Sequence, residues 1–254
     1  MEISSIHVAP DLTLYHTGPS LHLGPLPSFF YFSLSGPDSL GLDPFNQPVQ
    51  FLRGEMIRVF SLTLPGHENG LPATQAMQVW ADDFAKARNP IQDFLEGFDQ
   101  AFAFALENQW IQPDKVGVGG LSRGGLLALH AAARQEKIRY ALTFAPVTKL
   151  SRVKEFAALK EDPTVCSFNA ENLCSQLVQK HVRIYVGNHD TRVDTQACFH
   201  FAHSLVEASV QHQIRSPKVE FSMYPSIGHQ GHGTPPEIFR KGADWIKSCL
   251  ISSS

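Results

Sequence analysis

The sequence is poor in charge and holds no long hydrophobic run. Charged residues make up 18% of its 254 positions, the formal net charge is −3, and like charges do not gather in blocks. Such a balance disfavours a nucleic-acid-binding surface and a charged, disordered tail. No apolar stretch approaches the roughly 20 residues that span a bilayer, and the first residues lack a basic region followed by an apolar core. We therefore expect a cytoplasmic protein with no nucleic-acid or membrane partner.

Cysteine is also scarce, and the patterns that bind metals or cofactors are missing. The four cysteines show no Cys-x-x-Cys spacing, so we expect reduced thiols rather than a disulfide framework. Two His-x-x-His pairs, His229 with His232 and His200 with His203, have a spacing that zinc could use, but no His-Glu-x-x-His accompanies them. No Gly-Lys-Ser/Thr marks a phosphate loop, and the glycine-rich residues 117–122 lack the third glycine of a dinucleotide site. The sequence predicts neither a metal nor a cofactor.

What the sequence does contain is a globular composition and a regular alternation of elements. Apolar residues make up 43% of it, which is ordinary for a soluble globular domain. From about residue 50 onward, runs with strand propensity alternate with segments of helical periodicity, such as the helix expected to begin at Asn89-Pro90. This order predicts an α/β fold with one mostly parallel central sheet and helices on both faces. We expect a single domain over residues 1–254, in which 147–181 could form a small cap.

The most informative stretch is Gly120-Leu121-Ser122-Arg123-Gly124, which contains Gly-x-Ser-x-Gly. A short run of strand character precedes it, and an Ala/Leu-rich helical segment follows it. A strand, a sharp turn and a buried helix in that order are what a nucleophile elbow needs, because its serine lies on a strained turn flanked by small residues. A glycine-rich turn with an incidental serine is the alternative. Partners for Ser122 further along the chain decide between the two.

With this motif the sequence resembles the α/β-hydrolase superfamily, and the resemblance covers most of residues 28–250. It implies the α/β-hydrolase fold and a serine, a carboxylate and a histidine in that chain order. The segment at 187–193, Gly-Asn-His-Asp-Thr-Arg-Val, is similar to the Gly-x-x-Asp-x-x-Val of esterase-like and prolyl-oligopeptidase-like members, whose Asp is the triad acid. We take Asp190 as this acid and keep Asp194 as the alternative, although Asp194-Thr195 would also suit a helix N-cap.

The histidine is expected in the loop after the last predicted strand, which ends at Tyr224. That loop, Pro-Ser-Ile-Gly-His-Gln-Gly-His-Gly at 225–233, resembles the Tyr-Pro-x-x-Gly-His form of the superfamily's base loop and holds two histidines. We favour His229 as the general base by this register and keep His232 as the alternative. Ser122 would then be the nucleophile, and the acid would hold the imidazole in the correct tautomer.

An oxyanion hole needs two hydrogen-bond donors, here from the backbone. The resemblance implies that one is the amide of Arg123, the residue after the nucleophile, and that the other lies in the loop after the third strand. In that loop Ser35-Gly36-Pro37 stands where His-Gly-x is common, and Pro37 has no amide hydrogen to donate. Leu34 or Ser35 is the expected second donor.

These residues together predict a serine hydrolase that forms an acyl-enzyme intermediate, with small carboxylic esters as its substrates. A peptidase or thioesterase on the same triad is an alternative, because the elbow and the acid loop also resemble the catalytic domain of prolyl-oligopeptidase-type peptidases. Those peptidases carry a large additional domain, for which we expect no room in this chain. A non-catalytic ligand-binding protein on the same scaffold is a further alternative. The sequence leaves acyl specificity and oligomeric state open.

Overall fold

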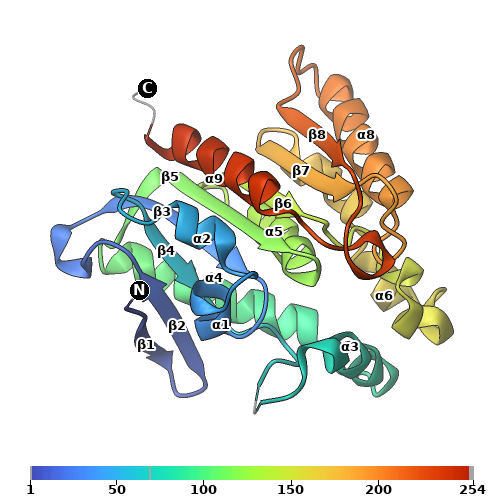
Figure 1. Cartoon of the computed structure of the whole chain (residues 1–254), viewed down its shortest axis with the longest axis horizontal. Helices are drawn as coiled ribbons and strands as arrows, with labels where there is room; N and C mark the ends of the chain where they lie inside the picture. Colours follow the sequence, from blue (N-terminus) through green and yellow to red (C-terminus); the bar gives the residue numbers. More distant parts are fainter. Residues whose placement is uncertain (1, 69, 252–254) are drawn as a thin grey trace.

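The computed structural model describes residues 2–68 and 70–251, and its centre is an eight-stranded sheet (Figure 1). The strand order is β1-β2-β4-β3-β5-β6-β7-β8. The strands from β4 to β8 in this order pair in parallel, whereas β2 is antiparallel to both of its neighbours. The strand bounds are β1 (Ser4–Ala9), β2 (Leu12–Thr17), β3 (Leu26–Phe32), β4 (Arg58–Ser61), β5 (Ile111–Leu121), β6 (Ile138–Phe144), β7 (His181–Gly187) and β8 (Val219–Tyr224).

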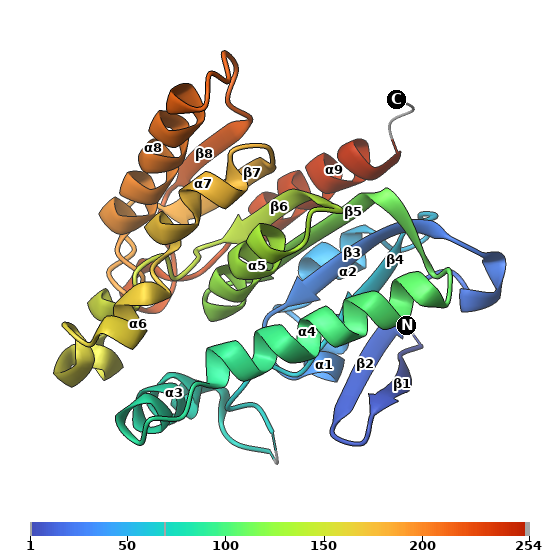
Figure 2. The same cartoon turned by 180° about the vertical axis from the view of Figure 1, so that it is seen from behind.

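Helices cover both faces of this sheet, as Figures 1 and 2 show from opposite sides. One face carries α1 (Gly36–Gly41), α2 (Gln47–Phe51) and α9 (Pro236–Ile251). The other face carries α3 (Ala76–Ala85), α4 (Pro90–Glu107), α5 (Arg123–Arg134), α7 (Cys174–Leu177) and α8 (Thr195–Gln211), with α6 (Pro163–Ser167) at the edge. The mostly parallel α/β-hydrolase fold expected from the sequence is confirmed.

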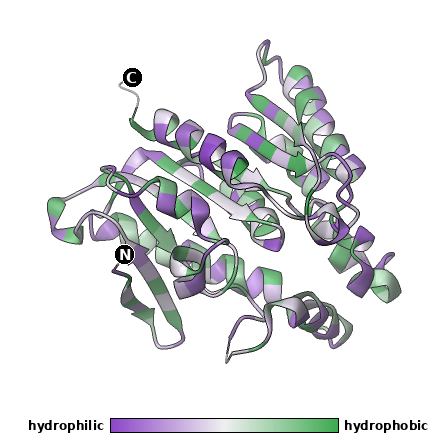
Figure 3. Cartoon of the chain, viewed as in Figure 1, coloured by the Kyte–Doolittle hydropathy of each residue, from purple (hydrophilic) through white to green (hydrophobic). Residues whose placement is uncertain are grey.

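The central strand β3 shows why the sheet is buried on both sides. Its side chains alternate, so that Phe29 and Tyr31 join the core under α2 and α9, while Phe30 and Phe32 join the core under α4 and α5. All four are fully buried. A strand covered on both faces needs a continuous apolar run rather than alternation, and the aromatic stretch at 29–32 is such a run. Figure 3 shows hydrophobic residues on the inner strands and also on the helices that cover them.

Helix α4 follows the expected start signals. Asn89 caps it by accepting a hydrogen bond from the Gln92 amide at 3.0 Å, and Pro90 occupies its first turn. The apolar residues along the helix face the sheet, and Phe98 packs edge-on against both Phe30 and Phe32. This packing fixes the helix beside the strand that leads into the oxyanion loop.

Two segments between the strands consist largely of short helices. Residues 35–48, after β3, contain α1 and the start of α2. The candidate cap at 147–181 consists of short helical pieces: η3 (Leu150–Arg152), η4 (Lys154–Leu159), α6, η5 (Ala170–Leu173) and α7. Several of its apolar side chains, including Phe156 and Leu177, join the main core. A capping role for this segment and the single domain over 1–254 both stay predictions.

Candidate active site

Ser122 lies on the turn between β5 and α5, with φ 56° and ψ −119°. A positive φ is costly for a residue with a side chain, and it persists only where the surroundings enforce it. Here the Ser122 amide donates to the Phe144 carbonyl at 2.9 Å, and the Ser122 carbonyl accepts the amides of Gly125 and Val147, each at 3.0 Å. The strained turn is therefore held from the neighbouring strand β6 and from the helix that it begins.

The glycines of the motif are required by close packing. A Cβ on Gly124 would lie 2.1 Å from the Phe32 carbonyl oxygen, and one on Gly120 would lie 2.4 Å from the Gly124 carbonyl carbon. Both contacts are with backbone, which cannot swing away as a flexible side chain could. Gly120 and Gly124 thus let β5, β3 and α5 approach closely enough to form the turn.

His232 bridges Ser122 and Asp190. Its Nε2 lies 2.9 Å from the Ser122 Oγ, and its Nδ1 lies 2.7 Å from the Asp190 Oδ2. The other Asp190 oxygen accepts the amides of Arg192 and Val193 at 2.9 and 3.1 Å. The Asp190 carboxylate is buried, and both of its oxygens accept hydrogen bonds. These bonds fix its orientation toward the imidazole.

The structure corrects the expected position of the histidine. His229 is exposed and lies in a short 3-10 turn, η6 (His229–Gly231), on the rim of the cleft. The histidine in hydrogen-bond reach of Ser122 is His232, which was the alternative. Gly231 precedes His232 just as Gly228 precedes His229, so the Gly-His pattern occurs twice and the register from Tyr224 selects the wrong copy.

The extra turn before His232 is held by contacts with the loop that carries Asp190. The Thr191 amide donates to the Gln230 carbonyl at 2.9 Å, and the His189 amide donates to the Ser226 Oγ at 2.7 Å. Gly231, with φ 72°, passes so close to the His189 carbonyl oxygen that a Cβ would lie 2.2 Å from it. The turn of three residues, His229 to Gly231, then brings His232 back to an isolated bridge with Ile227, three residues after the end of β8.

Asp194 plays the structural role considered for it. Its Oδ1 accepts the amides of Gln196 and Ala197 at 3.0 and 3.3 Å, which caps α8. Thr195 does not continue that cap but accepts the Asp190 amide at 2.9 Å and donates to the Gly187 carbonyl at 2.6 Å. Asp190, rather than Asp194, faces the imidazole.

The amides expected to form the oxyanion hole differ in whether they already donate a hydrogen bond within the protein. The Arg123 amide is in the first turn of α5, where a helix has no carbonyl four residues back to accept it. The Leu34 amide already donates to the Ser39 Oγ at 3.0 Å. Ser35 lines a different hollow from Ser122, beside Pro65 and His67. Arg123 is therefore placed to donate, while Leu34 could do so only by giving up its bond to Ser39.

A cleft of about 760 Å³ opens over Ser122 and His232. Leu34, Phe45, Leu121, Ile227 and Phe239 contribute apolar walls. The charged residues that line it are three basic ones and one acidic one, namely Arg123, Lys154, Arg192 and Glu155.

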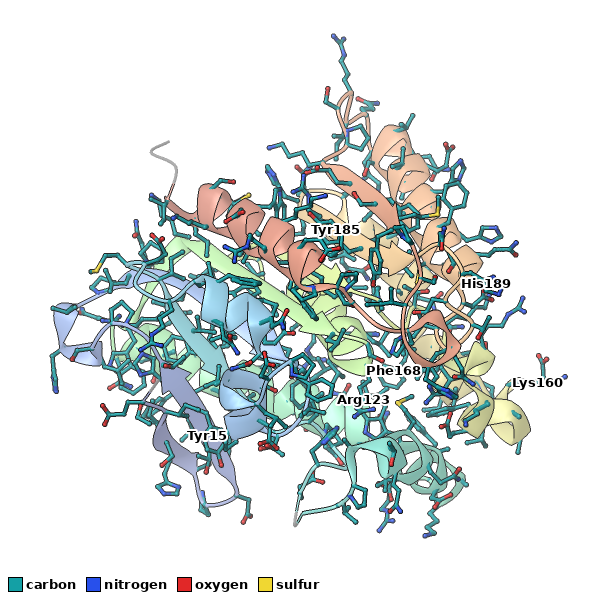
Figure 4. The ribbon with its side chains drawn as sticks, in the orientation of Figure 1. Tyr15, Arg123, Lys160, Phe168, Tyr185 and His189 are labelled. Carbon is teal, nitrogen blue, oxygen red and sulfur yellow. The ribbon has the colours of Figure 1, made fainter. Side chains whose placement is uncertain are left out.

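The side chain of Arg123 is a feature that the sequence reasoning missed. Its Nε and Nη2 lie 3.0 and 2.7 Å from the Nε2 of His67, and Nη2 also donates to the Ala73 carbonyl at 3.0 Å. Burial and the nearby Arg123 charge lower the pKa of His67 to about 4, so the ring is neutral at pH 7 and accepts at Nε2. Burial likewise lowers the pKa of Arg123 to about 10, which leaves it charged at pH 7. Figure 4 shows Arg123 at the end of β5, near the middle of the molecule.

Two structural findings concern metal sites and membrane-spanning helices. No group of three or more His, Cys, Asp or Glu side chains suited to a metal ion occurs within residues 2–68 and 70–251. His203 of the second His-x-x-His pair is exposed on α8, and its Nε2 lies 4.0 Å from the Glu207 Oε1. Over the same ranges, none of the helices combines the length and apolarity needed to cross a membrane.

Known structures resemble this fold closely. Prolyl oligopeptidase B from Galerina marginata, bound to a 35mer hydrolysis and macrocyclization substrate, matches with a TM-score of 0.69 at 18% identity, over 98% of this chain and 36% of that one. A putative dipeptidyl aminopeptidase IV from Bacteroides ovatus matches with a TM-score of 0.67 at 16% identity, over 98% and 35%. The acylaminoacyl peptidase of Pyrococcus horikoshii matches with a TM-score of 0.67 at 15% identity, over 97% and 41%. The chain thus spans between about a third and two fifths of the length of these proteins.

Comparison of the sequence itself finds fewer relatives than comparison of the fold, and it identifies the family. No curated protein matches the chain significantly. The profile of the prolyl oligopeptidase family, Peptidase_S9, matches residues 78–253, a range that includes Ser122, Asp190 and His232. Since this match covers well over half of the sequence, the chain belongs to the prolyl oligopeptidase family of serine peptidases and related hydrolases.

Proposed function

We propose that the protein is a serine hydrolase in which Ser122, His232 and Asp190 form the catalytic triad. The observation that carries this proposal is the continuous hydrogen-bonded chain from the Ser122 Oγ through both imidazole nitrogens to the buried Asp190 carboxylate. Nucleophile, base and orienting acid each have the partner that their role requires.

The geometry supports acyl transfer in two steps. With Nδ1–H donating to Asp190, the Nε2 lone pair of His232 accepts the Ser122 proton as the Oγ attacks the substrate carbonyl carbon. The Arg123 amide donates to the developing oxyanion. The imidazolium then gives its proton to the leaving nitrogen or oxygen, and an ester forms between the acyl group and Ser122. Water, deprotonated by the same His232, attacks this ester and releases the acid and the free serine.

The substrates that we propose first are short peptides. Family membership favours amide cleavage, and one structural relative is described as bound to a 35mer hydrolysis and macrocyclization substrate. Carboxylic esters are the second candidate, as the sequence predicted, because the apolar wall formed by Leu34 and Phe45 suits an acyl chain and the same triad cleaves both bonds. An alcohol is a better leaving group than an amine, so ester turnover alone does not identify the physiological bond.

Matched substrates test the proposal. A set of acyl groups, each presented as a 4-nitrophenyl ester and as a peptide-like coumarin amide, is assayed with the wild-type protein and with Ser122→Ala. We expect hydrolysis of both bond types by the wild type and a loss of at least about 10³-fold in kcat for the variant. Amide turnover that vanishes while ester turnover stays would select the esterase. Absence of both, in a folded wild-type protein, would favour a binding protein and contradict the proposal.

A further inference from the structure

The cleft over Ser122 carries a positive charge that the protein does not neutralise. Its single lining carboxylate, Glu155, forms a two-pronged ion pair with Arg192, with distances of 2.7 and 3.0 Å. The Glu155 charge also attracts Arg123, but its ion pair is with Arg192. Arg123 forms no ion pair with any carboxylate of the described residues, nor does the exposed Lys154 nearby.

The guanidinium of Arg123 is held in one orientation by neutral partners. Nε and Nη2 point at the His67 ring and the Ala73 carbonyl, and neither partner carries a negative charge at pH 7. Nη1 donates to no acceptor among the described residues. Arg123 is half-buried, and a cation partly removed from water without an anion costs free energy. The Nη1 hydrogens of this fixed guanidinium remain for a charge-assisted hydrogen bond to a carboxylate. The arrangement is that of a preformed site for a negatively charged group.

The strand order indicates which part of a substrate carries the negatively charged group that Arg123 would bind. Ser122 ends β5, His232 follows β8 on one side of it, and His67 follows β4 on the other side. The leaving group must lie on the His232 side, because His232 hands its proton to it. The guanidinium of Arg123 is anchored on the opposite side, against His67 and Ala73, where the acyl part of the substrate extends.

We propose that the Arg123 side chain is a specificity-determining residue that binds a carboxylate on the acyl part of the substrate. This inference rests on the proposed function of Ser122, and it names acidic acyl groups, such as a glutamyl or glutaryl group, as the preferred class. His67 is a positioning residue that aims the guanidinium.

Kinetic comparison of an acid with its uncharged isostere tests this preference. The substrates are 4-nitrophenyl glutarate, which carries a free carboxylate, and its terminal amide, with the 5-aminopentanoyl ester as a cationic third arm. For the wild type we expect kcat/KM to be roughly 10- to 100-fold higher for the acid than for the amide. Arg123→Gln should reduce that ratio to about one, and Arg123→Lys should keep part of it. Arg215→Gln removes an equal charge from an exposed loop at the far end of β8 and should keep the full ratio.

Binding to Ser122→Ala separates this inference from the proposed function. Calorimetry measures the Kd of the glutaric acid monoanilide and of its terminal amide, with no turnover required. We expect the acid to bind more tightly to Ser122→Ala by a similar factor, and Arg123→Gln in that background to abolish the difference. Equal binding of acid and amide, or tighter binding of the amide, would overturn the carboxylate site. An acid preference in binding, together with a wild type that has no hydrolytic activity, would support the site and refute the hydrolase.

Discussion

Single side chains in the site are held in place by backbone groups, and Asp190 shows this most clearly. One of its oxygens accepts two loop amides and the other faces the Nδ1–H of His232. A carboxylate can accept all three hydrogens, but a primary amide has only one oxygen. Any amide in this place must therefore turn its NH₂ group toward another donor.

Asp190→Asn should consequently lose activity without losing the fold. If the asparagine oxygen keeps the amides of Arg192 and Val193, its NH₂ group faces the imidazole and favours the wrong tautomer of His232. We expect a fall in kcat of about 10² to 10⁴-fold. Asp194→Asn is the matched control, because asparagine caps a helix as well as aspartate does, and its kcat should stay within about twofold. Steady-state kinetics of both variants check this, and equal losses in the two would contradict the assignment of Asp190.

The sequence pointed to Ser122 and Asp190, and it ranked His229 above His232 for a physical reason. Ser122 directly follows β5 and Asp190 lies three residues after the end of β7, so strand ends nearly fix their positions. His232 comes after a loop whose path depends on contacts with another loop, through Thr191, Ser226 and Gly231. The spacing of residues along the sequence does not predict such contacts between loops. For the same reason the pairing of Arg123 with His67, 56 residues earlier, could not be predicted.

At the scale of elements, the alternation of strands and helices and the mostly parallel sheet followed from the sequence pattern, whereas the strand order and the close packing between elements did not. The β3, β5 and α5 backbones meet at Gly120 and Gly124. The side chains of β3 point alternately into the two hydrophobic cores on the two faces of the sheet. Short helices such as α1 escaped prediction because a few residues with Gly and Pro carry too little periodicity. The junction at the elbow is the tightest contact between elements in the site.

Gly124→Ala tests that junction. Its Cβ would meet the Phe32 carbonyl at 2.1 Å, so α5 or β3 must shift. We expect the free energy of unfolding to fall by about 2–4 kcal/mol, with loss of activity. Gly97→Ala in the middle of α4 is the control, since its Cβ meets only the flexible end of Leu12 at 3.2 Å and alanine favours a helix. Urea unfolding compares the two variants, and similar midpoints would show that the close approach is not required.

At the scale of the whole molecule, buried histidines link stability to pH. Burial lowers the pKa of both His16 and His67 to about 4, with the charges of Arg58 and Arg123 acting in the same direction. His16 Nε2 also has no hydrogen-bond partner among residues 2–68 and 70–251. The ordinary pKa of an unfolded histidine is near 6.5, so the unfolded chain binds more protons than the folded protein between about pH 6.5 and 4.

The free energy of unfolding should therefore be nearly independent of these two groups above pH 7 and should fall as the pH drops from 6.5 toward 4. Each histidine contributes a loss of about 1–3 kcal/mol by pH 4. His16→Phe keeps the aromatic contact with Phe60 and removes one titrating group, so its stability should depend less on pH. Urea titrations at pH 7, 5.5 and 4.5 measure this. An unchanged slope in the variant would contradict the assignment of His16.

The central claim, that Ser122 is activated by His232, is tested most directly by mapping the site of covalent labelling. A fluorophosphonate probe reacts only with an activated serine, and mass spectrometry of the labelled protein identifies the modified residue. We predict that Ser122 carries the label in the wild type and in His229→Ala, and that labelling falls by at least about 10²-fold in His232→Ala. Circular dichroism confirms that each variant is folded. Label on a serine other than Ser122, or a His232→Ala protein that labels as fast as the wild type while His229→Ala does not, would contradict the account.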